Sequence, residues 1–211
     1  MIAITVNDKD VIQRLTALGK ELGKPQALAR VVGQEGVRLL KAHFRQKDKT
    51  PNKLGGKRVN YWRQVADSVN NQAVVSPGGS QVTIGISSPT FAQKLYGGTI
   101  TAKRGKALTI PVRPEAYGRA AKQLEDAEGV KLFVLSLSGQ GPGTGYLAAK
   151  AEDGAVKIYY VLRASVEQAP DPTALPDMAG FKAALVDNAE RYVADKIAKR
   201  TPNPPSAGAA P

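Results

Sequence analysis

The sequence predicts an α+β fold, in which an antiparallel β-sheet of hairpins packs against long N-terminal and C-terminal α-helices. Apolar residues recur at helical spacing over residues 26–46 and again over 178–199, whereas apolar and polar residues alternate in short segments between them. The links between consecutive alternating segments are too short for the crossovers that parallel strands need. We therefore expect neighbouring strands to pair antiparallel.

Length and composition favour one globular domain. The chain has 211 residues, 42% of them hydrophobic, which is enough to close a hydrophobic core. We predict a single α+β domain over residues 1–200, with long exposed loops at 47–60 and 139–145. Residues 201–211 are rich in proline and alanine, and we expect them to form a flexible tail.

The N-terminal part is predicted to hold one strand and two helices. Residues 2–6 alternate apolar and polar side chains and should form the strand, and helical spacing over 11–22 predicts the first helix. The second helix should run from about residue 26 to 46, with His43 near its apolar side as a packing residue. The predicted buried residues of this helix are Leu28, Val31, Val32, Leu39 and Leu40.

A basic loop and a short helix should follow. The stretch 47–60 is polar and rich in turn-forming residues. Its segment Gly55-Gly56-Lys57 is not a phosphate-binding loop, because Arg58 stands where that motif carries a hydroxyl. Residues 61–69 return to helical spacing, with Trp62 as a large packing or interface residue.

A hairpin is predicted next. Residues 72–76 and 81–87 read as strands, and the segment Pro77-Gly78-Gly79 between them is typical of a turn. The residues expected on the buried face of this hairpin are Val82, Ile84 and Ile86.

Most of the functional interpretation depends on the stretch 91–112. It begins with a short helix at 91–96, and Gly97-Gly98 lets the backbone leave that helix through angles that side chains forbid. The chain should then become extended, and the basic segment 103–106 should form a loop that projects from the sheet. Residues 108–112 should form a strand, and their proline, which has no amide hydrogen to donate, indicates either an edge strand or the end of a strand.

Residues 113–163 should contain a second set of hairpins. The segment 113–126 is helical or irregular, and its composition does not settle which. Strands are expected at 130–138, 146–151 and 156–163. The glycine-rich loop 139–145 is not a nucleotide-binding loop, because a strand and not a helix follows it. The residues predicted to face inward are Phe133, Leu135 and Leu137 on the first strand and Val156, Ile158, Tyr160 and Leu162 on the last.

The chain should end in a long helix. Residues 169–176 include several prolines and predict a stiff, extended connection. Helical spacing then runs over 178–199, and the basic residues at its end suit the negative end of the helix dipole. The predicted apolar stripe of this helix is Phe181, Leu185, Tyr192, Val193 and Ile197.

Composition argues against most catalytic chemistry. The chain has no cysteine and only one histidine, His43, so disulfides, thiolate metal sites and most histidine-based catalysis are unexpected. No motif joins a nucleophile to a base or pairs two carboxylates. We expect a protein that is not an enzyme and binds no cofactor or metal. We also expect no signal sequence and no membrane segment, and a reducing cytosol as the place of synthesis.

The net charge of +12 favours polyanions or acidic protein partners, without choosing between them. Basic residues are dense from Arg38 to Asp67, which also fits a solvated face with a mobile loop. No pattern of a sequence-specific nucleic-acid-binding fold is present, and the aromatic residues are too dispersed for base stacking. Contact with the DNA backbone alone stays open.

Several motifs, in this order, resemble the phage virion morphogenesis family. They are Ile84-Gly85-Ile86, Phe91-Ala-Gln-Lys-Leu-Tyr-Gly-Gly-Thr-Ile100, Leu108-Thr-Ile-Pro111 and Pro170-Asp-Pro-Thr-Ala-Leu-Pro176. The family includes the Mu G-like tail-completion proteins and is similar to the minor tail proteins called Z of lambda-type phages. The resemblance covers most of residues 8–199.

The resemblance implies a structural virion protein of a tailed bacteriophage, assembled in the host cytoplasm and located in the tail or neck. It implies a tail-completion subunit in a homo-oligomeric ring that helps join tail to head. Its partners would be tail terminator, head-closure or connector proteins, with phage DNA close by in the channel and no membrane. The residues expected to make contacts are Lys53, Lys57, Arg58, Trp62, Tyr96, Gly97, Gly98, Lys103, Arg104 and Lys106.

One alternative function comes from the charge. The chain could be a nonspecific DNA-binding protein that contacts the phosphate backbone through its basic loops. With so many exposed loops, we further expect the free protein to be monomeric until a partner orders them.

Overall fold

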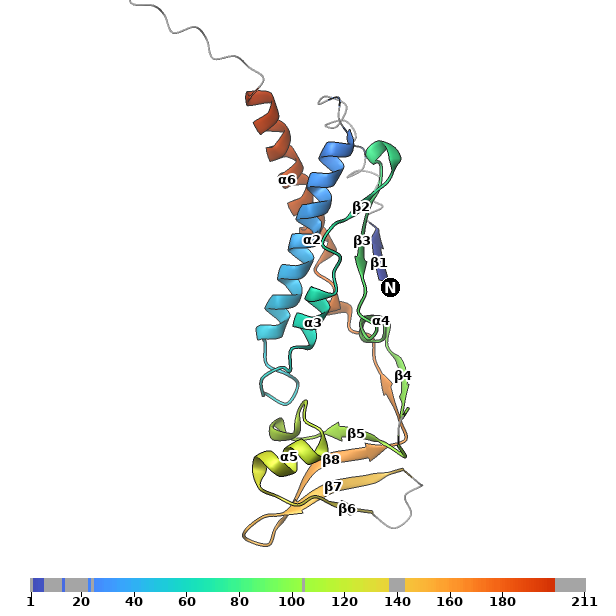
Figure 1. Ribbon diagram of the computed structural model, residues 1–211, viewed down its shortest axis with the longest axis vertical. Coiled ribbons are helices and arrows are strands. Elements are labelled where there is room, and N and C mark those ends of the chain that lie inside the picture. The colour runs from blue at the N-terminus through green and yellow to red at the C-terminus, as the bar shows by residue number, and fades with distance from the viewer. Residues whose placement is uncertain are drawn as a thin grey trace, which may run out of the picture. The chain divides into compact units, whose positions relative to one another are not determined.

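The computed structural model describes residues 2–5, 13, 23, 25–103, 105–136 and 143–199 (Figure 1). The chain divides into two compact units. The first unit comprises residues 1–43, 66–89 and 175–211, and the second comprises 44–65 and 90–174. The single domain over 1–200 stays a prediction. The helix expected over 11–22, Arg104, part of the 139–145 loop and the tail 201–211 lie outside the described residues.

The first unit is a small antiparallel sheet packed on two long helices. Its strands are β1 (Ile2–Thr5), β2 (Val74–Val75) and β3 (Val82–Ile86), in the order β1-β3-β2. Its helices are the first part of α2 (Pro25–Lys49) and all of α6 (Met178–Ala198). A Cβ atom added at Gly36 of α2 would lie 2.7 Å from Ile84 and 3.7 Å from both Phe181 and Leu185. The sheet, α2 and α6 therefore meet closely at this glycine, which confirms the predicted fold class.

The predicted hairpin of the first unit is present. β2 and β3 flank the short 3-10 turn η1 (Pro77–Gly79), but β2 is shorter than the strand expected over 72–76. Ile84 and Ile86 are buried as predicted, whereas Val82 is only half-buried. The strand expected at the N-terminus is β1, which pairs with β3 from Ile2 opposite Ile86 to Thr5 opposite Thr83.

The two long helices differ in detail from the prediction. Helix α2 continues to Lys49, and Val31 and Leu39 are only half-buried, whereas Val37 and Phe44 are buried. In α6, Ile197 is 50% exposed, so its predicted place on the buried stripe is wrong. Every residue from 194 to 199 is exposed, because the last turn extends beyond the packed surface.

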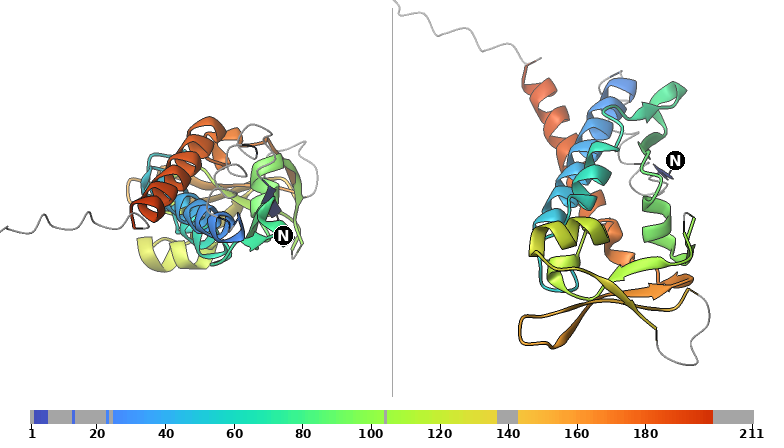
Figure 2. Two further views of the ribbon diagram at one scale, coloured as in Figure 1. Left: turned by 90° about the horizontal axis from the view of Figure 1, so that it is seen from above. Right: turned by 60° about the horizontal axis from the view of Figure 1, so that its bottom comes forward.

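The second unit holds two further antiparallel sheets (Figure 2). The larger has the order β5-β8-β7-β6, and the smaller pairs β4 with β9. The four strands of the larger sheet are β5 (Leu108–Pro111), β6 (Phe133–Leu135), β7 (Gly145–Lys150) and β8 (Val156–Arg163). Those of the smaller are β4 (Gly98–Thr101) and β9 (Ser165–Gln168). The meander β6-β7-β8 confirms the predicted antiparallel hairpins.

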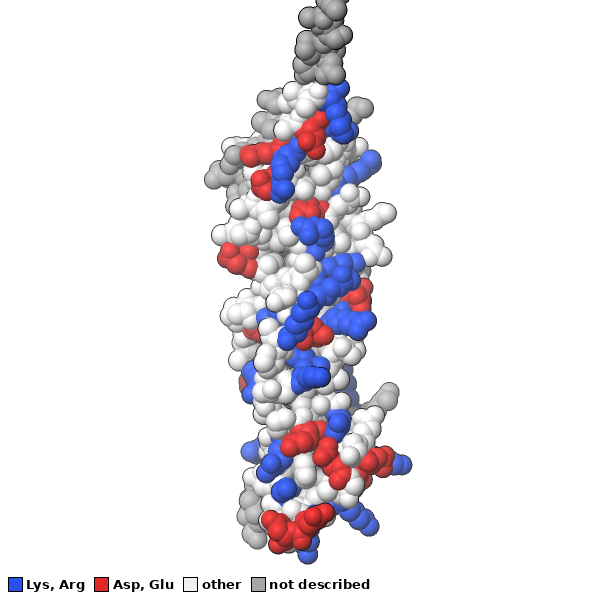
Figure 3. All heavy atoms as spheres, turned by 90° about the vertical axis from the view of Figure 1, so that its left-hand side faces the viewer, with Lys and Arg blue, Asp and Glu red and all other residues white. Residues whose placement is uncertain are grey.

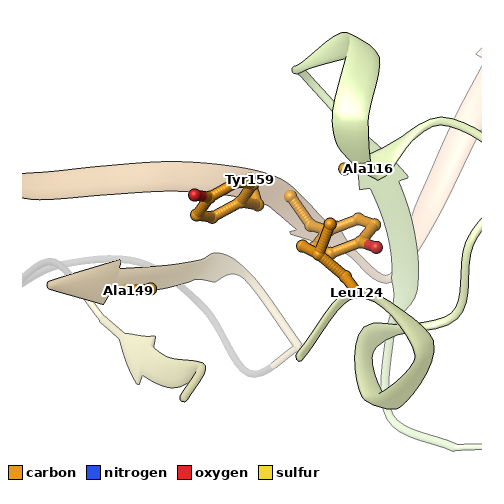
Figure 4. Close-up of a cluster of buried hydrophobic side chains, with 5 residues drawn as sticks. Ala116, Leu124, Ala149 and Tyr159 are labelled. Atoms are coloured by element: carbon orange, nitrogen blue, oxygen red, sulfur yellow. The ribbon is translucent and has the colours of Figure 1, made fainter. Parts of the chain in front are cut away.

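Short helices complete the second unit. The segment whose structure the composition left open contains the 3-10 turn η2 (Pro114–Ala116) and helix α5 (Ala121–Glu128). Leu124 of α5 packs with Ala116, Ala149, Tyr159 and Tyr160 in one buried cluster (Figure 4). Helices α3 (Tyr61–Asp67, shared with the first unit) and α4 (Phe91–Tyr96) lie earlier in the chain.

The predicted alternation along β8 fails at two residues. Val156 is 51% exposed, and Tyr159 is buried beside Tyr160. Leu147 pairs with Tyr160 whereas Ala148 pairs with Ile158, so Tyr159 is an extra residue in the strand. Such a bulge shifts the alternation by one position, which is why two successive tyrosines are buried.

The connection to the last helix is less extended than predicted. Residues 165–168 form β9, which the sequence did not indicate, and residues 172–174 form the 3-10 turn η3 (Pro172–Ala174). The carboxylate of Asp171 accepts hydrogen bonds from the Thr173 amide at 3.1 Å and the Thr173 hydroxyl at 2.7 Å. This local turn shortens the segment before α6 begins.

Candidate interaction surface

The double glycine after α4 joins that helix to strand β4. Gly97 has φ 73°, and its amide donates to the carbonyl of Gln93 at 2.9 Å, which ends the helix. A Cβ atom at Gly97 would lie 2.4 Å from the carbonyl oxygen of Gln168, and Gly98 has φ 117°. Only glycine combines this backbone angle with so close an approach to β9.

The basic loop between β4 and β5 projects from one strand edge. Thr101 pairs with Ser165 and Leu108 pairs with Arg163, so the loop leaves and rejoins the paired strands on either side of the single residue Ala164. Lys103 and Lys106 on this loop are exposed. Within the described residues β5 lies at an edge of its sheet, as predicted, although β4 and β5 belong to two different sheets.

The second basic loop, 50–60, is held in shape by one buried side chain. Asn52 is 6% exposed, and its Oδ1 accepts from the amides of Leu54 at 2.7 Å and Gly56 at 3.2 Å. Its Nδ2 donates to the carbonyl of Lys57 at 3.0 Å. This loop therefore presents Lys53 and Lys57, both exposed, from a defined backbone. The sequence carries a signal for this ordered loop, because an asparagine side chain often accepts a hydrogen bond from the backbone amide two residues later, as Asn52 does from Leu54.

Arg58 closes the same loop. Its Nε donates to the carbonyl of Thr50 at 3.0 Å, and the side chain is half-buried. The prediction of an exposed basic loop thus holds for Lys53 and Lys57. Arg58 is half-buried and Asn52 is buried, and both side chains donate hydrogen bonds to backbone carbonyls of the loop and its start.

Trp62 is a packing residue and not an exposed contact residue. It is 1% exposed and stacks on Phe44, with ring centroids 6.0 Å apart and planes inclined by 8°. Phe91 meets the ring of Phe44 edge-on at 5.3 Å. Of the two roles that the sequence allowed for Trp62, the structure shows packing. Tyr96, by contrast, is 69% exposed at the end of α4.

One cation, Lys47, lies over the ring of Trp62 and has further charged groups near it. The ammonium of Lys47 stands 4.6 Å from the centroid of the Trp62 ring and donates to the Thr173 carbonyl at 2.6 Å. Lys94 pairs with Asp171 at 3.2 Å. The pKa of Lys47 lies below its ordinary value, mainly because its ammonium group is partly buried. The charge of Asp171 raises this pKa, whereas repulsion by Arg58 and Lys94 lowers it. We call Lys47, Arg58, Lys94 and Asp171 the cation cluster.

A groove borders the cation cluster. It has a volume of about 640 Å³ and is lined by Lys53, Lys94, Ile100 and the segment 166–173. The structure thus brings Lys53 of one predicted loop next to the strand that follows Gly97 and Gly98. Sequence reasoning missed Lys47, Lys94 and Asp171, because they come from three segments with no shared motif.

Two cations on the long helices are neutralised by neighbouring carboxylates. On α2, Arg38 pairs with Glu35 at 2.5 Å, and on α6 Arg191 pairs with Asp187. The hydrogen bond from Arg38 holds the pKa of Glu35 below its ordinary value. Figure 3 shows acidic side chains interleaved with basic ones over such surfaces. These helices have the character of a solvated face, unlike the two basic loops.

The described residues contain neither a candidate metal site nor a candidate membrane span. No group of three or more His, Asp or Glu side chains among them could hold a metal ion. None of the helices in that part of the chain is long and apolar enough to cross a bilayer. His43 is half-buried on α2, where a packing role was expected.

Comparisons with family models, with curated proteins and with solved structures find no match for this chain. The resemblance to the virion morphogenesis family therefore stays a prediction that rests on the motifs themselves. The two most distinctive of those motifs are strands β4 and β5, which flank the basic loop 102–107.

Proposed function

We propose that this chain is a structural subunit of a tailed bacteriophage virion, which acts in the neck or at the head-proximal end of the tail and helps join tail to head. The observation that carries the proposal is the glycine-hinged edge element 97–111. Its two motif strands, β4 and β5, frame an exposed basic loop at a sheet edge. Such an element suits docking against neighbouring subunits.

Backbone geometry gives a physical reason. An edge strand carries unpaired amide and carbonyl groups, and another chain can add to it by the same ladder that holds a sheet together. Tyr96 and Val112 are exposed beside the two strands and can supply apolar contacts. In this proposal the partners are further copies of the chain in a ring and other neck or tail proteins, with phage DNA nearby.

Deletion of the coding sequence from its genome tests this function. The proposal expects lysates with filled heads and finished tails that fail to join, as seen by electron microscopy. Restoring the gene from a plasmid should restore joined particles. Normal yields of infectious particles from the deletion strain would contradict the proposal.

Nonspecific DNA binding is the second candidate, and the exposed cations of both loops favour it. Lys53, Lys57, Lys103 and Lys106 are all exposed and could contact phosphates. Filter binding across a salt series separates the two functions. A steep loss of affinity with salt reports many phosphate contacts, whereas a structural subunit should bind duplex DNA weakly or not at all.

A further inference from the structure

The four-stranded sheet of the second unit is covered on one face by α5. Residues that pair across neighbouring strands point to the same face of a sheet. Leu147 and Tyr160 are such a pair. Tyr160 belongs to the buried cluster that includes Leu124 of α5, and Leu147 packs against that cluster (Figure 4). The side chains of this pair therefore point to the face that α5 covers.

The opposite face of this sheet is apolar, and we call it the open face. Its residues alternate along each strand with those of the covered face. One row of paired apolar residues crosses all four strands on the open face, and a second row lies beside the first. The first row is Ile110, Val161, Tyr146 and Leu135, and the second includes Ile158 and Phe133.

Within the described part of the chain, no element buries the open face. All six side chains of the two rows are only half-buried. Val161 lies on β8, which has a strand on each side, and is half-buried nonetheless, whereas Tyr160 on the covered face of the same strand is 1% exposed. An apolar sheet face is normally buried against another element. A contiguous apolar surface that stays open is typical of an interaction site.

One end of the open face is basic. Arg163 follows Val161 by two residues on β8 and so points to the open face. Its side chain is exposed and forms no ion pair with any carboxylate among the described residues. Lys103 and Lys106, both exposed, belong to the loop before β5, and Leu108 at the start of β5 pairs with Arg163. The three cations therefore lie at the same end of the sheet.

No carboxylate within the sheet offsets these cations. The four strands contain no aspartate or glutamate, and neither does the loop 102–107. At the opposite end, Lys150 is followed by Glu152 and Asp153 in the turn between β7 and β8. The open face is thus positive at one end only. This favours a partner that carries carboxylates at one end of an apolar surface.

We propose that the open face binds one amphipathic helix of a partner protein, with the apolar side of the helix on the two rows and an acidic end over Arg163. Burial of apolar side chains supplies favourable free energy, and carboxylates form charge-assisted hydrogen bonds with the Arg163 guanidinium. This inference goes beyond the proposed function, because it assigns a docking face and a partner chemistry whatever assembly the chain belongs to. Its failure would leave the proposed function standing.

The dimensions of the sheet fit a single helix. Four strands spaced by about 4.8 Å span about 14 Å, and a helix with its side chains is about 10–12 Å wide. The eight residues of β8 span about 23 Å, which matches a helix of about 15 residues. One helix along the strands therefore covers both rows and reaches Arg163.

A synthetic helix is the probe. It is a fluorescein-labelled peptide of about 15 residues, with leucines at the i, i+3, i+4, i+7 spacing of an amphipathic helix and three glutamates at one end. Fluorescence anisotropy with the whole chain measures binding at 150 mM salt, where charges beyond about 8 Å are largely screened. A second peptide with the same leucines and three lysines in place of the glutamates should bind at least fivefold more weakly.

Two cations on β8 give a matched pair of charge variants. Arg163 and Lys157 are both exposed, but Lys157 pairs with Ala149, a member of the cluster on the covered face. Arg163→Glu should weaken binding of the glutamate peptide at least fivefold, and Lys157→Glu should change it less than twofold. Because both side chains are exposed, both variants should keep the thermal midpoint of the natural chain.

Two exposed valines give a matched pair of apolar variants. Val156 is 51% exposed and precedes Ile158 by two residues, so it points to the open face. Val134 is 62% exposed and pairs with Leu147, so it points to the covered face. Val156→Ser should weaken peptide binding at least threefold, and Val134→Ser should change it less than twofold.

Four results would overturn the inference. They are no saturable change in anisotropy, equal affinity for the two peptides, equal losses within both pairs of variants, or a dimer in light scattering that Val156→Ser converts to monomers. The last result would assign the open face to a second copy of the chain. The expected result is saturable binding of the glutamate peptide to a monomer, weakened by Arg163→Glu and Val156→Ser and preserved in Lys157→Glu and Val134→Ser.

Discussion

Gly97 shows how one residue sets the course of the chain between α4 and β4. Replacing it by alanine would place a Cβ 2.4 Å from the carbonyl oxygen of Gln168 and 2.8 Å from the nitrogen of Pro170, at φ 73°. We expect Gly97→Ala to lower the free energy of unfolding by about 3 kcal/mol. Urea unfolding followed by Trp62 emission measures this change.

Gly55 is the matched control. Its φ of 78° is close to that of Gly97, but a Cβ there would meet nothing within 4 Å. Gly55→Ala should therefore lower stability by only about 1 kcal/mol, the usual penalty for a side chain in this conformation. Equal losses in the two variants would show that the approach to β9 does not constrain Gly97.

Asp171 should make stability depend on pH. Its folded-state pKa lies below the ordinary value of 3.8, so its contribution is present above pH 3.8 and is lost as the pH falls through the lower folded value. We expect Asp171→Asn to be less stable than the natural chain by about 1 kcal/mol at pH 7. The difference should shrink towards zero in strong acid, as followed by thermal unfolding at several pH values.

Glu167 provides the comparison for this prediction. It is an exposed acid on the preceding strand, so Glu167→Gln should change stability by less than about 0.5 kcal/mol at any of these pH values. A difference between Asp171→Asn and the natural chain that stays constant down to strong acid would contradict the pairing with Lys94 and Thr173.

Helix α4 is anchored to its unit by Phe91. This side chain is fully buried, and its ring lies 5.3 Å from that of Phe44 and 6.5 Å from that of Trp62, edge-on in both cases. Phe91→Ala should lower the free energy of unfolding by about 3–5 kcal/mol, because it opens a cavity among large rings. Tyr96→Ala on the same helix, at a side chain 69% exposed, should change it by less than about 0.5 kcal/mol. Similar values for the two would refute this anchoring role.

Elements with strong local signals could be predicted from the sequence. These signals depend only on residues that are close in the sequence. They are the helical spacing of α2 and α6, the Pro-Gly-Gly turn between β2 and β3, and the glycines after α4. β9 could not be predicted in this way, because Ser165-Val-Glu-Gln168 has a single apolar residue and is a strand only through its pairing with β4. The bulge at Tyr159 likewise depends on the register of β7 against β8.

The candidate surface was only partly predictable for the same reason. Lys53, Lys57, Lys103 and Lys106 stand out as loop cations, and all four are exposed. Lys47, Lys94 and Asp171 meet only after α2, α4 and the segment before η3 have folded together. Trp62 was ambiguous because a large aromatic residue on a short helix fits both a core and an interface.

At the scale of the whole molecule, we expect the purified chain to be a monomer. In this account the edge strands and basic loops bind partners only inside the assembled virion, so they do not hold two free chains together. The positive charge of the chain also makes free chains repel one another. Light scattering at moderate salt should give a mass near 22.3 kDa. A stable dodecamer in the absence of partners would contradict this prediction.

The central claim is that the chain is a structural part of a virion at the junction of head and tail. Immunogold electron microscopy of purified particles, with antibodies raised against the whole chain, tests it most directly. The account predicts gold at the head–tail junction of intact particles and at the head-proximal end of isolated tails. Particles without label, or label confined to the tail tip or the head surface, would contradict it.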